Sequence, residues 1–426
     1  MLVLFEDESV PQLYPITIGK PAYTIGCGSY RLLDLVGGLA GPVHAVVRPH
    51  LTAFRQAEPP PKPGGEAPRE AVVYVNARLV PSVAAIGQVK KLLATGRAGM
   101  LNASAEHRPE NHRKPGANGD DVALAIVPRG TTLLPDTATL QDLAAWLAQL
   151  KLPQLDSPKL PLFDYPHDVV RHHLKILSQN LEHRLAKCDY RESQPGVFVA
   201  EGARLGEHVV ADTERGPIVL DQSASIGPFC FLRGPAYVGP HARVIEHSAI
   251  KDGVCLGHTT KVGGEVEGSI IEPYTNKQHH GFLGHSFLGS WVNLGAGTCN
   301  SDLKNTYGPV NMEYQGRRVA TGMQFVGAIV GDYAKTAINT GIFTGKTVGA
   351  CSMVYGFVTT NVPSFTNYAR LFGQVTEAPV EVMVATQARM FARRQVEQRP
   401  CDIQLLQAMY ELTRHERQLA GEPLSL

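Results

Sequence analysis

The sequence of 426 residues lacks the features that mark several large classes of protein. It contains no apolar run of about 18 residues, the length that a membrane-spanning helix needs, and its first residues, MLVLFEDESV, become acidic too early for a signal peptide. Lysine and arginine (40 residues) almost balance aspartate and glutamate (39), so no overall electrostatic field favours nucleic acid or anionic lipid. We therefore expect a cytoplasmic protein that binds small molecules or proteins, and neither nucleic acid nor membrane.

Closely spaced cysteines are also lacking. The seven cysteines are scattered along the chain, and no pair has CxxC spacing. This pattern argues against a disulfide framework and against thiolate zinc sites. The sequence therefore predicts no metal site built from cysteine.

What the sequence does contain is a strong repeat. A helix would repeat its apolar residues every three or four positions and a strand every two, whereas here aliphatic residues recur every six. The uninterrupted series is Leu220, Ile226, Leu232, Val238, Val244, Ile250, Leu256 and Val262. Three six-residue edges close one triangular coil, so the repeat predicts a left-handed parallel β-helix with aliphatic side chains stacked inside. A glycine often follows the aliphatic residue, and we expect it at the corners, in a backbone conformation unfavourable to residues with a Cβ.

The repeat divides the chain into four parts. Residues 1–162 alternate short β-rich runs with helical stretches at 82–94 and 140–150, which indicates an α/β domain. Polar segments rich in proline and glycine, 58–70 and 103–120, are predicted as loops within it. Residues 163–190 are predicted as a linker helix that starts near Pro166, residues 191–362 as the β-helix, and residues 363–426 as a helical cap that is interrupted at Pro400.

The repeat fails between Glu265 and Asn311, and this stretch gathers polar residues suited to catalysis. Residues 276–305, NKQHHGFLGHSFLGSWVNLGAGTCNSDLKN, hold His279, His280 and His285. A histidine can accept a proton from an attacking amine or hydroxyl near neutral pH. Backbone N–H groups of the glycine-rich segment 294–298 would stabilise the oxyanion formed in acyl transfer.

Several of these strings carry a family resemblance. GHSFLGSWVNLGAGT, with PFCFLRGPA at 228–236, resembles the acetyltransferase domain of the bifunctional uridyltransferase and glucosamine-1-phosphate acetyltransferase, GlmU. NKQHHGFLGHS and SDLKNTYG resemble sugar nucleotidyltransferases of the GlmU type, which join an α/β nucleotidyltransferase-like domain to a β-helix. The resemblance implies a transferase in sugar-nucleotide biosynthesis that moves an acetyl group from acetyl-coenzyme A to a sugar phosphate or sugar nucleotide. It also implies a homotrimer, with the coenzyme between adjacent β-helices.

The resemblance assigns roles to individual positions. His279 matches the catalytic histidine that deprotonates the acceptor. Substrate contacts are implied for Arg233, Asn293, Lys304 and Phe282, the last standing where the relatives have a tyrosine, while Ser269 or a neighbour stands where they have a phosphate-binding lysine. Ala296 and Gly297 would contact acetyl-coenzyme A, and Arg389, Arg393 and Arg394 either meet its phosphates or form a solvated helix face. These changes predict an altered sugar-phosphate pocket.

For the N-terminal half, the resemblance implies nucleotidyl transfer to a sugar-1-phosphate with a nucleoside triphosphate and Mg²⁺. The GxGTRM-type loop of such enzymes is missing. The nearest candidates are Lys20 and Arg31 as phosphate ligands, with the glycines at 26–28 between them offering backbone amides. Candidate Mg²⁺ carboxylates are Asp7, Asp34 and Asp121.

Two further hypotheses remain open. A metal-dependent lyase of the γ-carbonic-anhydrase type would use His280 and His285, with His258 or His247, as zinc ligands across subunits. A trimeric scaffold without catalysis would present a degenerate N-terminal domain, which the missing GxGTRM loop favours.

Overall fold

The computed structural model describes residues 1–37, 39, 42–58, 71–104, 121–128, 130–131 and 139–419. The segments 58–70 and 103–120 that were predicted as loops lie almost entirely outside these residues. The described chain forms two compact units. The first comprises Met1–Leu13, Lys20–Ile25 and Tyr30–Tyr165, and the second comprises Tyr14–Gly19, Gly26–Ser29 and Pro166–Leu426.

The first unit is an α/β domain around a five-stranded sheet of order β2-β1-β3-β5-β4. Its parallel strands are β1 (Leu2–Phe5), β2 (Val43–Val46) and β3 (Ala71–Asn76), and β5 (Val122–Pro128) runs antiparallel to β3 and to β4 (Gly99–Asn102). The helices are α1 (Leu32–Val36), α2 (Thr52–Ala57), α3 (Val83–Ala94) and α4 (Leu140–Gln149). Leu143 and Leu147 of α4 pack against Phe5, Tyr74 and Val127 of the sheet, so the apolar side of α4 forms the core with the strands.

Helix α5 (Pro166–Lys187) belongs to the second unit and starts at the predicted proline. Proline suits the first turn of a helix because the N–H that it lacks would have no partner there. Leu177 and Leu181 pack against Val219, Tyr237 and Cys255, which point outward from one face of the β-helix. This helix therefore covers part of that face.

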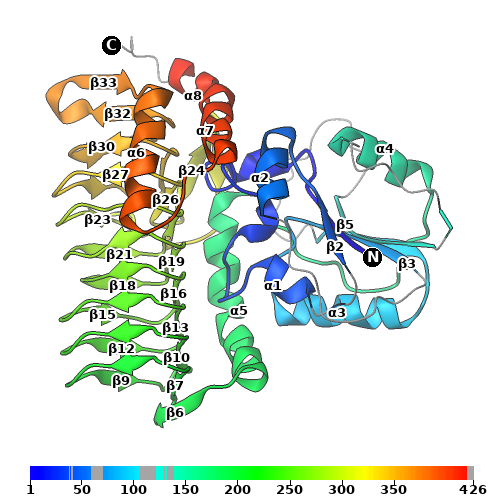
Figure 1. Ribbon diagram of the computed structural model, residues 1–426, viewed down its shortest axis with the longest axis horizontal. Helices are drawn as coiled ribbons and strands as arrows, with labels where there is room; N and C mark the ends of the chain where they lie inside the picture. The colour runs from blue at the N-terminus through cyan, green and yellow to red at the C-terminus, as the bar shows by residue number, and fades with distance from the viewer. Residues whose placement is uncertain are drawn as a thin grey trace. The chain divides into compact units, whose positions relative to one another are not determined.

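Parallel strands stacked coil upon coil form the three faces of the β-helix (Figure 1). The first face is built from β7 (Val197–Val199), β10 (Ile218–Leu220), β13 (Ala236–Val238), β16 (Val254–Leu256), β19 (Ile270–Ile271), β22 (Phe287–Leu288), β26 (Ala328–Val330) and β29 (Lys346–Val348), with β6 (Arg191–Gln194) antiparallel at its edge. The second is built from β8 (Arg204–Leu205), β11 (Ser225–Ile226), β14 (Arg243–Val244), β17 (Lys261–Val262), β20 (Asn276–Lys277), β27 (Lys335–Thr336), β30 (Met353–Val354) and β32 (Thr366–Ala369), with β33 (Gln374–Glu377) antiparallel at its edge. The third is built from β9 (Val210–Asp212), β12 (Phe231–Arg233), β15 (Ala249–Ile250), β18 (Glu265–Glu267), β21 (Phe282–Gly284), β23 (Cys299–Asn300), β28 (Gly341–Ile342) and β31 (Phe357–Val358).

The aliphatic residues of the six-residue repeat fill the interior of the β-helix, as predicted. Leu220 pairs with Val238, and Val238 with Leu256, at the 18-residue interval of one coil. All eight residues of the series are at most 3% exposed. The predicted fold class, an α/β domain followed by a left-handed β-helix and C-terminal helices, is confirmed.

The prediction that the corner glycines adopt a backbone conformation unfavourable to residues with a Cβ is wrong. The left-handed backbone conformation falls two residues later, on residues with side chains such as His241 and Thr259 (φ 56° and 59°). Gly239 and Gly257 are needed because a Cβ there would lie 2.6 Å from the Leu256 carbonyl oxygen and 2.7 Å from the Pro273 nitrogen of the next coil. Glycine is therefore required by the close approach of neighbouring backbones.

The break in the repeat is a change of coil length within a continuous β-helix. Leu256 pairs with Ile271 and Val262 with Lys277, so these coils are 15 residues long (271 − 256 and 277 − 262) instead of 18. Leu288 then pairs with Val330, because the chain leaves the β-helix after β23 and returns at β26. We call residues 301–327 the excursion; it contains an antiparallel hairpin of β24 (Asn311–Tyr314) and β25 (Arg317–Ala320).

The C-terminal helices are α6 (Val380–Arg393), α7 (Pro400–Leu412) and α8 (Arg414–Leu419). Pro400 is the first residue of α7, and the interruption precedes it. Buried Met383, Phe391, Leu405 and Met409 hold α6 and α7 in place. No helix within the described residues is both long and apolar enough to cross a membrane.

Candidate functional site

A groove lies on the third face where the excursion leaves the β-helix. Its volume is about 660 Å³, and it is lined by residues of β23, β28 and β31 and by the first residues of the excursion. Polar groups come from Ser301, Lys304 and Thr344, and apolar walls from Phe343 and Phe357. Lys304 Nζ donates to the Pro309 carbonyl oxygen (3.2 Å), which fixes this side chain beside the groove.

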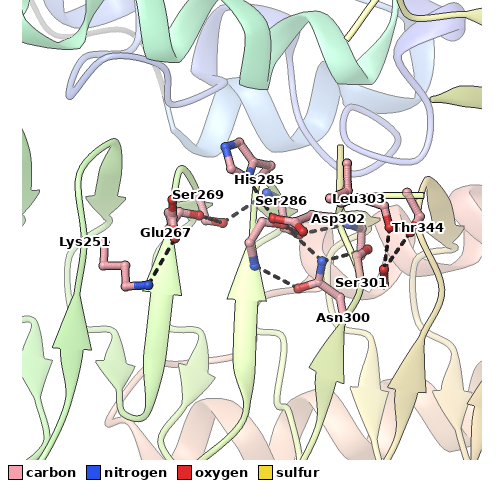
Figure 2. A network of polar contacts seen from close by, with 12 residues as sticks. Lys251, Glu267, Ser269, His285, Ser286, Asn300, Ser301, Asp302, Leu303 and Thr344 are labelled. Carbon is pink, nitrogen blue, oxygen red and sulfur yellow. Dashed lines mark hydrogen bonds and ion pairs between the residues drawn. The ribbon is translucent and has the colours of Figure 1, made fainter. Parts of the chain in front are cut away.

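Asn300 fastens the floor of the groove to the previous coil. It pairs in register with Ile342 and is 6% exposed, so it occupies an inward position that is otherwise aliphatic. Its Oδ1 accepts from the Gly284 amide (2.9 Å), and its Nδ2 donates to the Gly284 carbonyl (3.1 Å). Because both ends of the amide are used, Asn300 holds β21 and β23 together (Figure 2).

His279 lies at the corner between the second and third faces, just before β21. The side chain is exposed, and its imidazole has no hydrogen-bond partner among the described residues. One coil further on, Gly297 N donates to the His280 carbonyl oxygen (3.1 Å). His279, Phe282, Ala296 and Gly297 therefore lie on two successive coils around one corner, which we call the His279 corner, and the chain continues from there into β23 and the groove.

Lys277 supports this corner from inside the β-helix. It pairs with Val262 at an inward position and is 2% exposed. Its ammonium group donates to the carbonyl oxygens of Gly263 (2.6 Å) and His279 (2.8 Å). Burial lowers the pKa of Lys277 to about 8, since a charge in apolar surroundings loses its hydration.

We expect Lys277→Met to lower acyl-transfer activity by roughly tenfold or more, because a methionine fills the same space and leaves the His279 corner without its two hydrogen bonds. The free energy of unfolding should change by less than about 1.5 kcal/mol, since a buried charge is exchanged for an apolar side chain. Lys335→Met is the matched control. Lys335 also has its pKa lowered to about 8 by burial, but it points outward from the second face, and its ammonium group donates to the Tyr333 carbonyl oxygen (3.0 Å). Equal activity losses in both variants would contradict the role of Lys277.

A second histidine is held by a carboxylate at the opposite end of β21. His285 Nδ1 lies 2.8 Å from Asp302 Oδ2 (Figure 2). The His285 ring stacks on Phe325 with centroids 5.2 Å apart. Val326 N donates to Asp302 O, and Gly327 N to His285 O. The pair therefore fastens both ends of the excursion to the β-helix.

Other residues assigned by resemblance lie away from the His279 corner. Arg233 is on the third face, three strand spacings or about 14 Å from Phe282, and forms an ion pair with Asp212 (2.8 Å). Asn293 is on the second face, where its Oδ1 accepts from Asn276 Nδ2 (3.3 Å). Ser269, 0% exposed, donates to the Glu267 carbonyl. The structure thus groups His279 with Phe282, places Asn293 on the second face three residues before Ala296, and leaves Arg233 and Ser269 apart.

Zinc ligation as in the γ-carbonic anhydrases finds no support within one chain. His280 and His285 lie at opposite ends of β21, and His285 Nδ1 faces Asp302. No group of three or more histidine, cysteine, aspartate or glutamate residues in the described part of the chain could hold a metal ion.

The glycine-rich segment proposed to hold nucleotide phosphates is already bound within the second unit. The Gly26 amide donates to Glu272 Oε1 (2.8 Å), and the Gly28 amide to His173 Nδ1 (2.9 Å). Lys20 and Arg31 belong to the first unit. Lys20 is 9% exposed, and Arg31 forms an ion pair with Asp34 (2.6 Å) at the start of α1. The amides of Gly26 and Gly28 are therefore not available to a phosphate, which corrects that part of the prediction.

His173 should make the protein sensitive to acid. Burial lowers its pKa to about 4, against about 6.5 for a free imidazole. Between these two pKa values, His173 binds a proton in the unfolded chain but not in the folded chain. The free energy of unfolding therefore falls as the pH drops from about 6.5 towards 4. We expect the free energy of unfolding to fall by about 2 kcal/mol from this residue between pH 7.5 and 5.

The measurement is urea unfolding of wild type and His173→Gln at both pH values. Glutamine retains an acceptor for Gly28 and a donor for the Gly253 carbonyl (2.9 Å from His173 Nε2) without titrating. His415→Gln, at an exposed histidine, is the control and should keep the wild-type pH dependence. An unchanged pH dependence in His173→Gln would rule out this source of acid sensitivity.

In the first unit, two candidate Mg²⁺ carboxylates surround an arginine. Arg78 is 0% exposed, and its Nη2 donates to Asp7 Oδ2 (2.7 Å) and Asp121 Oδ2 (2.5 Å). Its Nε donates to Asp7 Oδ1 (2.9 Å), and its Nη1 to Asp164 Oδ1 (3.1 Å) and the Phe163 carbonyl (2.7 Å). All five guanidinium donors are used. Asp7 and Asp121 therefore do not fit a Mg²⁺ ion in this arrangement, because the guanidinium already occupies their oxygens.

Comparison with known proteins shows a family similarity of the N-terminal part. Residues 2–187 match the sequence model of the family described as sugar nucleotidyl transferase. The match covers 186 of the 426 residues (187 − 2 + 1), so it concerns the N-terminal part of the chain only. The GlmU-type resemblance is thereby confirmed, together with similarity to curated proteins of the same kind.

Two curated relatives are named as bifunctional, and the name of the second gives both activities. The bifunctional protein GlmU of Methanococcus vannielii is 30% identical over 119 residues, 28% of this chain and 28% of that protein. The bifunctional sugar-1-phosphate nucleotidylyltransferase/acetyltransferase of Sulfurisphaera tokodaii is 28% identical over 143 residues, 33% of this chain and 36% of that protein. The chain thus spans about a third or less of the relatives it matches.

Among solved structures, a UDP-N-acetylglucosamine acyltransferase of Francisella novicida aligns with 55% of this chain and 79% of its own, at 14% identity and a TM-score of 0.36. At that score the likeness carries no information about function.

Proposed function

We propose that this protein transfers an acetyl group from acetyl-coenzyme A to an amine or hydroxyl of a sugar phosphate or sugar nucleotide, at the His279 corner. The observation that carries the proposal is the position of an exposed histidine, without a hydrogen-bond partner among the described residues, on the corner from which the chain enters a groove of about 660 Å³. The relative of Sulfurisphaera tokodaii, named as a bifunctional sugar-1-phosphate nucleotidylyltransferase/acetyltransferase, supports the same reaction.

In this mechanism His279 accepts the proton of the attacking amine or hydroxyl as the new bond to the acetyl carbon forms. The proton then passes to the thiolate that leaves when the carbon–sulfur bond breaks. The Ala296 amide has no acceptor among the described residues, whereas the Gly297 amide donates to His280 O. Ala296 N–H is thus the free donor for the developing oxyanion, and Gly297 fixes the shape of the corner.

The experiment is to incubate the full chain with acetyl-coenzyme A and a panel of amino-sugar phosphates and sugar nucleotides, and to follow the coenzyme thiol as it is released. Acceptor-dependent thiol release, with the acetylated sugar identified by mass, is the expected result. Thiol release that does not depend on any acceptor would contradict the proposal. Sedimentation analysis of the same preparation tests the proposed homotrimer.

We propose nucleotidyl transfer to a sugar-1-phosphate as a second activity of the first unit, supported by the family match of residues 2–187. Lys20 and Arg31 remain its candidate phosphate ligands. Because Asp7 and Asp121 are held by Arg78, we assign them no metal-binding step. Release of pyrophosphate from nucleoside triphosphates and sugar-1-phosphates, measured with and without Mg²⁺, tests this activity.

A further inference from the structure

The second face of the β-helix carries a row of polar side chains that point outward. Arg243 pairs in register with Lys261, and Lys261 with Asn276. Their neighbours Val244 and Val262 are buried in the core, so alternation along each strand turns the row outward. Adjacent strands lie about 4.8 Å apart, and the side chains therefore form one continuous strip.

Helix α6 ends on this strip and adds two arginines. Arg394 Nη2 donates to Asn276 Oδ1 (2.7 Å), and Arg393 precedes it in the chain. One turn earlier, Phe391 is 5% exposed and packs against Trp291 with ring centroids 4.6 Å apart. This contact fixes the end of the helix. We call Arg243, Lys261, Arg393 and Arg394 the cation cluster.

Nothing in the described part of the chain neutralises the cation cluster. None of its four members forms an ion pair with a described carboxylate. The pKa of Lys261 is lowered by burial and by the nearby Arg394, Arg243 and Arg393. Burial, Arg393 and Arg243 likewise lower the pKa of Arg394. The fold holds these like charges close together, and an anion that binds among them reduces their mutual repulsion. The cation cluster is therefore preorganised for a multiply charged anion.

We propose that the cation cluster binds the diphosphate group of a nucleotide sugar, and that the acceptor in acyl transfer is therefore a sugar nucleotide. The inference rests on the proposed acyl transfer. Guanidinium groups match pairs of phosphate oxygens, and a lysine adds a point charge.

The position of His279 favours this ligand. His279 follows Asn276 by three residues, at most about 10 Å along the chain. A sugar joined directly to a diphosphate spans a distance of that order and brings its amine or hydroxyl to the imidazole. The pantetheine arm, which separates the reactive thioester of acetyl-coenzyme A from its diphosphate, is longer.

The test measures ligand binding by the full chain with calorimetry, using UDP, ADP, inorganic pyrophosphate and coenzyme A as probes. The double variant Arg243→Gln, Lys261→Met should bind a nucleoside diphosphate and pyrophosphate at least roughly tenfold more weakly than wild type, because two charge-assisted contacts are lost. Binding of coenzyme A should be unchanged. Arg204→Gln is the matched control, since Arg204 is an exposed arginine on the same face, two strands from Arg243.

Unchanged diphosphate affinity in the double variant would overturn the proposal, and so would a loss confined to coenzyme A, which would place the donor at the cluster. Both substituted side chains are at least partly exposed, so the melting temperature should stay near that of wild type. Binding is measured without turnover. If diphosphates bind through the cluster but no sugar is acetylated, the proposed function fails while the binding site stands.

Discussion

Replacing His279 with alanine is expected to lower kcat for acyl transfer by roughly 100-fold to 10,000-fold, the usual contribution of a general base. The substitution removes the group that accepts the acceptor's proton, whereas the groove residues and the cation cluster stay in place. KM for acetyl-coenzyme A should therefore change little. The measurement is steady-state thiol release over a range of coenzyme and acceptor concentrations, which separates kcat from KM.

His280→Ala is the control for this experiment. His280 is the next residue, is also exposed, and takes part in the same corner through its backbone carbonyl. An alanine there preserves that carbonyl and removes a second imidazole from the same surface. If His280→Ala loses as much activity as His279→Ala, the loss reflects a disturbed corner and His279 is not the base.

His285 is the competing base, because a carboxylate orients its ring as in many acid-base pairs. Accessibility favours His279. The His285 side chain is only 17% exposed and its ring is stacked on Phe325, whereas the His279 side chain is exposed. An unchanged kcat in His279→Ala, together with a large loss in His285→Gln, would transfer the role to His285.

The fold could be predicted from the sequence because its period is local. Val238, for example, pairs with Leu256 one coil later, and this 18-residue interval is three of the six-residue spacings that the sequence shows. Strands and helices of the first unit likewise follow from alternation and from apolar spacing. The six-residue period does not reveal why glycine is required at the corners. That requirement depends on how closely Gly239 approaches the backbone of the next coil.

The site could be predicted only in part. The strings around His279 lie within one short stretch, so the histidine and its glycine-rich neighbours were recognisable in sequence. Gly26 and Gly28 were misread because their partners, Glu272 and His173, are 246 and 145 residues away. The cation cluster does have a sequence signal in the 18-residue interval between Arg243 and Lys261, but Arg394 joins it only through the tertiary fold. The inward position of Lys277 was not detectable, because the 15-residue coil shifts it out of the six-residue phase that ends at Val262.

The loss of the Arg78 side chain is expected to be the most destabilising change in the first unit. Arg78→Met leaves Asp7, Asp121 and Asp164 facing one another without a cation, and breaking a buried ion pair from one side costs about 3–5 kcal/mol of unfolding free energy. Arg31→Met is the control, because Arg31 pairs with Asp34 at the surface, with side chains 49% and 31% exposed. That change should cost no more than about 1 kcal/mol.

The two tryptophans allow the Arg78 variant to be followed in its own unit. Trp146 packs on Tyr74 in the first unit, and Trp291 lies in the second. In a Trp291→Phe background, fluorescence during urea unfolding therefore reports the first unit alone.

The loss of unfolding free energy in Arg78→Met should become smaller in acid, because the three carboxylates take up protons and stop repelling one another. Millimolar Mg²⁺ should stabilise this variant, since it restores a cation to the three carboxylates, and should leave wild type unchanged. If Mg²⁺ stabilised wild type to the same degree, Asp7 and Asp121 would be able to bind a metal ion in the presence of Arg78, which would contradict the assignment.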